Sequence, residues 1–188
     1  MLSGAARVYK QATREMFLDF RGTYHSVAET IKLMALSPLI NADTLEQRVK
    51  SVAMLATALQ GERSLSAIQL SYPNGDFFIV RPLTSVNLRQ TFSAPDTAQY
   101  VADHVSSGSD GERRLIRLVF DDQLHEISSE APISTGYDPR SRPWYQNAGT
   151  QVRAIKPYLF YFIGKVGTTV TLKTPTSGVV IAADITLE

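Results

Sequence analysis

One long amphipathic helix at the start of the chain constrains the fold most. Residues 5–36 contain one glycine and no proline, the two residue types that most weaken a helix. The apolar positions in this stretch recur every three or four residues, at Phe17, Phe20, Tyr24, Val27, Ile31 and Met34. This spacing places them on one stripe of a helix. We expect the stripe to pack on the chain's own domain, and its near-heptad spacing also allows a homodimer through the N-terminal helix.

A second helix is predicted directly after the first. Ser37-Pro38 ends the first helix, because proline cannot continue the hydrogen bonding of a helix. Asn41-Ala42-Asp43 then offers capping side chains for a helix over about residues 45–59. Helices therefore dominate the first third of the chain, residues 1–60.

The rest of the chain, residues 61–188, has the pattern of a β-rich module. Short runs of β-branched and aromatic residues predict strands, and Asn74-Gly75 between the first two runs is a strong hairpin signal. A short helix is predicted at residues 95–105. The predicted strands lie at residues 66–71, 76–80, 115–120, 124–127, 168–173 and 179–185. This order predicts an α+β fold, with a long N-terminal helix and an antiparallel sheet flanked by helices.

Composition argues against several classes of function. The 19 lysine and arginine residues nearly balance the 18 aspartate and glutamate residues and form no run, so no nucleic-acid partner is expected. The absence of cysteine excludes disulfides, thiol nucleophiles and thiolate metal sites. No run approaches the ~18 apolar residues of a membrane span, and the start lacks the apolar centre of a signal peptide. If the chain acts outside the cytoplasm, we expect its membrane anchors to lie beyond its ends.

Recognisable catalytic and cofactor motifs are absent from the sequence. It contains no GxxxxGK[ST] phosphate loop, no GxGxxG and no GxSxG elbow. The histidines lack metal-ligand spacing, and although His125 stands near Asp121, Asp122 and Glu126, a solvated hairpin turn explains that group better than a metal site. No carboxylate pair is singled out for acid/base work. We therefore expect no cofactor, no metal and no enzymatic activity.

One segment, residues 136–148, concentrates residue types that hold small ligands. Its sequence is GYDPRSRPWYQNA, with two prolines that restrict the backbone and two arginines between them. Tyrosine, tryptophan and arginine offer rigid apolar faces and charge-assisted donors for a small anion. A structural explanation uses the same residues: Asp138 caps a turn, Arg140 pairs with it, and Trp144 fills the core. Spacing alone favours the structural explanation, and we expect the segment to do some of each.

The string DPRSRPWYQNA resembles the signature of Cache domains, which are sensor modules of bacterial chemoreceptors, histidine kinases and cyclic-nucleotide or cyclic-dinucleotide enzymes. Residues 74–78 (NGDFF) resemble a hairpin strand of that family, Pro157-Tyr158 follows the signature as it does there, and residues 179–185 (VVIAADI) resemble the closing strand. The resemblance runs along most of the chain and is sharpest at the signature and the closing strand. It implies a PAS-like sensor module behind a long helix.

The resemblance leaves two arrangements of modules open. In two-module Cache receptors a long helix leads into a membrane-distal PAS-like module, and the chain after the closing strand builds a membrane-proximal one. This sequence stops at Glu188, where that second module would begin. The helix plus the distal module is therefore the favoured interpretation, and a complete single-module Cache domain is the alternative.

The resemblance to Cache domains that bind amino acids implies six candidate ligand-binding residues in this sequence: Tyr137, Arg142, Trp144, Tyr145, Tyr158 and Asp184. In this interpretation Arg142 binds an α-carboxylate, Asp184 binds an α-ammonium, and the aromatic rings exclude water. The sequence departs from the family at Ala182-Ala183, where a glycine usually precedes the aspartate, and in the bulky residues 159–162 beside Tyr158.

The resemblance implies the periplasmic or extracytoplasmic sensor of a bacterial inner-membrane receptor. Such a sensor binds a small ligand, an amino acid or another small carboxylate or amine, and signals through its N-terminal helix. The alternative is a ligand-free interaction or dimerisation module that acts through a partner protein. Residues 75–81 resemble sensors attached to nucleotide cyclases. The output of the receptor therefore stays open between a cyclase, a kinase and a chemoreceptor.

Overall fold

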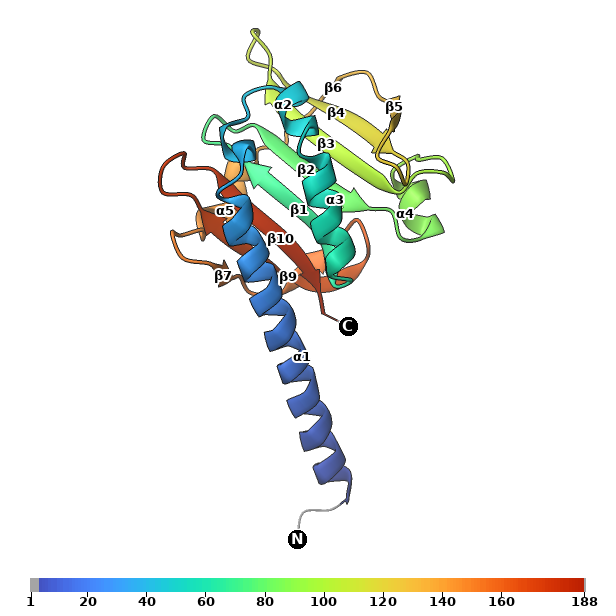
Figure 1. Ribbon diagram of the computed structural model, residues 1–188, viewed down its shortest axis with the longest axis vertical. Helices are drawn as coiled ribbons and strands as arrows, with labels where there is room; N and C mark the ends of the chain where they lie inside the picture. The colour runs from blue at the N-terminus through green and yellow to red at the C-terminus, as the bar shows by residue number, and fades with distance from the viewer. Residues whose placement is uncertain (1–3, 188) are drawn as a thin grey trace.

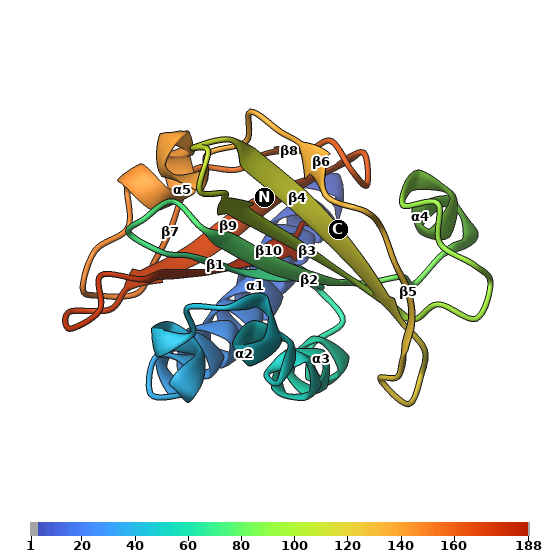
Figure 2. The ribbon, with the colours of Figure 1, turned by 90° about the horizontal axis from the view of Figure 1, so that it is seen from above.

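In the computed structural model, a ten-stranded antiparallel sheet carries helices on one face and the segment after β6 on the other (Figures 1 and 2). The structure describes residues 4–187, with the side chains of Gln11 and of residues 20–187. The helices are α1 Gly4–Met34, η1 Pro38–Asn41, α2 Leu45–Val49, α3 Val52–Gly61, α4 Val86–Thr91, η2 Pro139–Ser141 and α5 Pro143–Gln146. The strands are β1 Leu65–Ser71, β2 Phe77–Pro82, β3 Tyr100–Ser107, β4 Arg113–Phe120, β5 Glu126–Ser129, β6 Ile133–Ser134, β7 Arg153–Ala154, β8 Tyr158–Phe160, β9 Lys165–Lys173 and β10 Val180–Thr186.

The strands follow the order β5-β4-β3-β2-β1-β10-β9-β7, with β6 paired to β4 and β8 paired to β9. The last strand, β10, therefore lies beside the first, β1, in the middle of the sheet. Its register places Asp184 opposite Ala67. The α+β fold predicted from the sequence is confirmed, including the β1–β2 hairpin and the closing strand.

The C-terminal half of α1 packs on the sheet together with α3, and the N-terminal half projects past the domain (Figure 1). Val27, Ile31 and Met34 are buried in the main core, as the apolar stripe predicts. The Tyr24 hydroxyl donates to the Val152 carbonyl at 3.3 Å. The side chain of Phe17 lies outside the described residues, and the homodimer stays a prediction. Among residues 4–187, no helix is both long enough and apolar enough to cross a membrane.

The predicted second helix is wrong in its continuity and in its cap. It is divided into α2 and α3 at residues 50–51. Its cap is Thr44 rather than Asn41-Ala42-Asp43: the Thr44 side chain accepts from the Gln47 amide at 3.2 Å, and the Gln47 side chain accepts from the Thr44 amide at 3.2 Å. This reciprocal capping box satisfies two donors at once, which a single capping side chain does not.

The predicted helix at residues 95–105 is also wrong. Its second half is β3, which pairs with β2 and β4 in the interior of the sheet. Pro95 begins a turn instead of a helix, because the Ala98 amide donates to its carbonyl at 2.9 Å. A short helix that the sequence analysis did not predict, α4, begins after Ser85, whose side chain accepts from the Leu88 amide at 3.2 Å.

Candidate functional site

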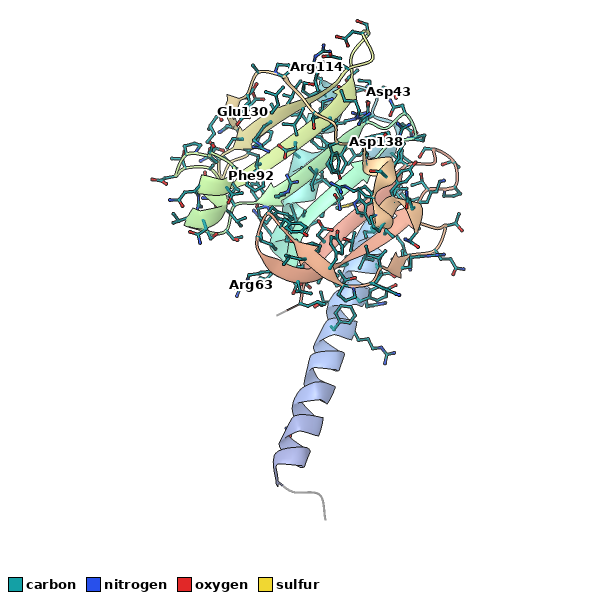
Figure 3. All side chains as sticks on the ribbon, turned by 180° about the vertical axis from the view of Figure 1, so that it is seen from behind. Asp43, Arg63, Phe92, Arg114, Glu130 and Asp138 are labelled. Atoms are coloured by element: carbon teal, nitrogen blue, oxygen red, sulfur yellow. The ribbon has the colours of Figure 1, made fainter. Side chains whose placement is uncertain are left out.

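The signature segment lies over part of the sheet face opposite α1 and α3 (Figures 2 and 3). Trp144 of α5 is 4% exposed and lies in a second apolar cluster with Phe77, Ala182 and other residues of the central strands. Its ring centroid lies 6.2 Å from that of Phe77 and 6.2 Å from that of the half-buried Tyr145. Trp144 and Tyr145 thus anchor the segment to the sheet. Ala182 belongs to the Ala182-Ala183 pair that departs from the Cache pattern, and its small side chain packs in this cluster.

The start of the signature is a rigid turn. The Asp138 side chain accepts from the Arg140 amide at 2.9 Å and pairs with the Arg140 guanidinium at 2.7 Å. The Arg140 hydrogen bond and charge lower the pKa of Asp138 to about 2. Both residues are partly exposed, and Figure 3 shows Asp138 at this turn. The two residues therefore have the capping and pairing roles of the structural explanation.

Asp184 is a buried carboxylate with one oxygen bonded and one open. Its Oδ1 accepts from Gln69 Nε2 at 3.2 Å and from Thr169 Oγ1 at 2.6 Å. Its Oδ2 accepts no hydrogen bond from any described residue. Burial raises the pKa of Asp184 to about 6, although the Thr169 hydrogen bond and the Arg81 charge act to lower it. A cation placed at Oδ2 relieves this cost.

Two tyrosines bring Arg142 and Asp184 into one neighbourhood. The Tyr158 hydroxyl is 2.8 Å from Thr169 Oγ1, which itself donates to Asp184. Burial and the Asp184 charge raise the pKa of Tyr158, and Arg142 acts to lower it. Burial also raises the pKa of Tyr137. Arg142 acts to lower this pKa, and the Asp184 charge acts to raise it. Four of the six residues implied by the resemblance therefore lie within electrostatic reach of one another.

Arg142 itself pairs with no carboxylate of the described residues. Its guanidinium carbon lies 4.9 Å from the ring centroid of Tyr137, in the geometry of a cation–π contact. The Tyr137 ring in turn lies 4.9 Å from that of Phe77. Its neighbour Arg140 is paired with Asp138, so Arg142, which is exposed, is the arginine of this segment without a carboxylate partner among the described residues.

A triad of charges lies beside this group on the same face. Arg81 donates to Asp103 at 2.9 Å, and Arg117 donates to both oxygens of Asp103 at 2.7 and 3.0 Å. Burial alone would raise the pKa of Asp103, but the two arginines hold it below its usual value. The sequence analysis did not select these residues. The available signal was a single charged residue, Arg81 or Asp103, within a mainly apolar run.

The bulky residues 159–162 are divided between two environments. Phe160 is 2% exposed and packs over Gly167, where a Cβ atom would lie 2.1 Å from the Phe160 ring. Phe162 is half-buried, with its ring 5.2 Å from the Arg81 guanidinium carbon. Leu159 and Tyr161 are exposed. The segment therefore closes the side of the site near Arg81 with aromatic rings.

A cavity of about 530 Å³ opens beside this closure, at the end of the sheet. Phe162 and Pro82 line it together with residues of α4 and of β1, and neither Arg142 nor Asp184 does. Within the described part of the chain, no three histidine or carboxylate side chains are grouped for a metal ion. His125 is exposed and lies 3.4 Å from Asp121 in the β4–β5 turn.

The fold is that of known sensory domains. The chain is similar to the sensory domain of the Campylobacter jejuni chemoreceptor Tlp3, with a TM-score of 0.54 at 16% identity over 94% of this chain and 57% of that one. The ligand-binding domain of the same receptor in complex with L-valine gives a TM-score of 0.53 at 16% identity, over 94% of this chain and 56% of that one. The shared topology confirms the sensor-type α+β fold.

One curated protein is related in sequence. Adenylate cyclase 1 of Rhizobium meliloti (strain 1021) is 29% identical over 146 residues, which are 76% of this chain and 22% of that protein. The chain thus spans about a fifth of the cyclase and a little over half of the Tlp3 domain. No protein-family model matches the sequence, so membership of the Cache family stays a prediction.

Proposed function

We propose that this chain is the extracytoplasmic sensory domain of a bacterial transmembrane receptor and that it binds a small amino acid rather than catalysing a reaction. The observation that carries the proposal is a pair of opposite charges beside Tyr137 and Tyr158: an exposed arginine and a buried carboxylate. Arg142 has no carboxylate partner among the described residues, and Asp184 has an oxygen without a donor. A zwitterion supplies both missing groups.

The comparisons support the ligand class and the output. The Tlp3 sensory domain has been solved with isoleucine and with L-valine bound. The proposed site uses the corresponding kind of ligand: Arg142 binds its carboxylate, Asp184 binds its ammonium, and the tyrosine rings exclude water. The cyclase relative supports a nucleotide cyclase as the output of the intact receptor.

The β1–β2 turn offers a physical connection from the site to α1. On the site side, Arg113 donates to the carbonyls of Tyr137 and Gly75. Gly75 has φ +90°, a left-handed conformation that glycine adopts readily. A shift of the signature segment at Tyr137 is therefore passed to the turn through one arginine.

On the helix side, the same turn is held by a buried arginine. Arg48 is 1% exposed, pairs with Asp76 at 2.9 Å, and donates to the Ala42 carbonyl at 3.0 and 3.1 Å. The Tyr72 hydroxyl donates to the Leu39 carbonyl at 2.9 Å. Residues 39–42 lie shortly after α1, which ends at Met34, so the turn connects the ligand segment with the end of the long helix. We propose this as the route to the N-terminal helix.

A ligand screen tests the proposed function. Unfolding is followed by thermal shift with the 20 amino acids, with amines and with small carboxylates; a ligand at 100 times its dissociation constant adds about 2.7 kcal/mol of stability. Calorimetric titration of the best ligand should then show that Arg142→Ala and Asp184→Ala each weaken binding by about 2–5 kcal/mol. The matched control is Arg153→Ala, which removes an exposed arginine on β7. This variant should bind the ligand normally.

The two charges can be separated by the choice of ligand. A carboxylate without the amine should stay sensitive to Arg142→Ala and lose its sensitivity to Asp184→Ala, a pattern that general unfolding does not produce. If no amino acid, amine or carboxylate stabilises the wild-type protein, the ligand-binding proposal fails. The alternative, an interaction module that signals through a partner protein, then takes its place.

A further inference from the structure

Arg81 on β2 is a charged side chain that the proposed amino-acid site has not used. The β1–β2 register ends with Ile68 opposite Val80. Continuing it by one residue places Arg81 beside Ala67, which pairs with Asp184 on its other side. The three side chains form one row across the sheet, with the smallest in the middle. Neighbouring strands lie about 4.8 Å apart, so Arg81 and Asp184 stand on either side of the buried Ala67, separated by one strand.

The hydrogen bonding of Arg81 is incomplete. Its Nη1 donates to Asp103, but the same carboxylate also accepts two bonds from Arg117. Two guanidinium groups therefore share one carboxylate. The Nε of Arg81 is buried and has no hydrogen-bond partner among the described residues. A buried donor without an acceptor is rare and calls for an explanation.

The surroundings of Arg81 hold it in place without satisfying that donor. The ring centroids of Phe92 and Phe162 lie 5.1 and 5.2 Å from its guanidinium carbon, and the side chain is 14% exposed. Its charge acts on Asp184 and Tyr137, two residues of the proposed site. The charge of a second carboxylate, Glu130, helps to raise the pKa of Arg117. Arg81 is thus a preorganised cation at the edge of the site.

We propose that Arg81 determines specificity and that the ligand is an α-amino acid with a second carboxylate in its side chain. This inference rests on the proposed function, in which Arg142 and Asp184 bind the α-carboxylate and the α-ammonium. The side-chain carboxylate accepts from Nε of Arg81 and supplies the charge that Asp103 shares between two arginines. An aliphatic side chain at the same place leaves that donor unsatisfied.

The test is a ligand series on the wild-type protein and two variants. Calorimetric titration with L-glutamate, L-aspartate and L-norvaline should show an acidic amino acid binding about 10- to 100-fold more tightly than norvaline. Arg81→Gln should remove most of this preference. Arg117→Gln, which breaks the same Asp103 cluster but keeps Nε of Arg81, should retain it.

Each outcome separates this inference from the proposed function. Norvaline binding as tightly as the acidic amino acids to wild-type protein overturns the role of Arg81 but leaves an amino-acid sensor. Equal loss of preference in Arg81→Gln and Arg117→Gln also overturns it, because the whole cluster is then responsible. If Arg81→Gln does not fold, the wild-type series decides alone. If no amino acid binds, the proposed function fails and this inference fails with it.

Discussion

Replacing Asp184 by asparagine should stabilise the protein at neutral pH while weakening ligand binding. Asp184 is 4% exposed, and burial raises the pKa of its carboxyl from 3.8 to about 6. Ionising such a group costs about 3 kcal/mol of folding stability. Because the folded-state pKa lies above the unfolded value, the protonated form stabilises the fold below about pH 4. That contribution is lost as the pH rises through about 6.

Urea unfolding followed by the fluorescence of Trp144, the single tryptophan, measures this effect. At pH 7.5 the free energy of unfolding of Asp184→Asn should exceed that of the wild type by about 2–3 kcal/mol, whereas at pH 4 the two should nearly agree. Asp138→Asn is the matched control: its partly exposed pair with Arg140 is worth about 0–1 kcal/mol, and its loss should not stabilise the protein. Equal destabilisation by Asp184→Asn at both pH values would show that ionised Asp184 does not cost folding stability.

Three further predictions concern the core, the hairpin turn and possible partners. Trp144→Ala should lower the free energy of unfolding by about 3–5 kcal/mol in thermal or urea unfolding, and Tyr161→Ala, at an 89% exposed position, should leave it unchanged. Arg48→Met should cost about 3–5 kcal/mol by stranding a buried carboxylate. It should also raise the pKa of His104, which burial and the Arg48 charge hold at about 4; NMR titration checks this. Fluorescence anisotropy should detect no binding to DNA, and salt-sensitive micromolar binding would contradict the even charge balance.

The parts of the fold that the sequence predicted correctly carry strong local signals. Asn74-Gly75 marks the hairpin, alternation marks β4, and runs rich in β-branched residues mark β9 and β10. The parts that failed depend on competition between local and distant interactions. The apolar residues of β3 suited a helix locally, but the strand is held by β2 and β4 on either side. The break between α2 and α3 lacks proline and glycine, and no residue there indicated it.

The site was predictable only where a motif marks it. The signature and the closing strand indicated Tyr137, Arg142 and Asp184, which lie within electrostatic reach of Tyr158. Their role in binding a ligand stays a prediction. Sequence spacing could not identify their neighbours Gln69, Thr169, Arg81 and Asp103, because these depend on the register of five strands. The charges of Arg81 and Asp103 were visible in apolar strands, but their shared face became apparent only with the pairing known.

The proposed site is best tested by a crystal structure of the protein grown with the amino acid that gives the largest thermal shift. We expect the ligand's carboxylate to contact the Arg142 guanidinium and its ammonium to lie within hydrogen-bond distance of Asp184 Oδ2, between the rings of Tyr137 and Tyr158. A ligand bound instead in the cavity beside α4, or a bound ligand that leaves both charges without contact, would contradict it.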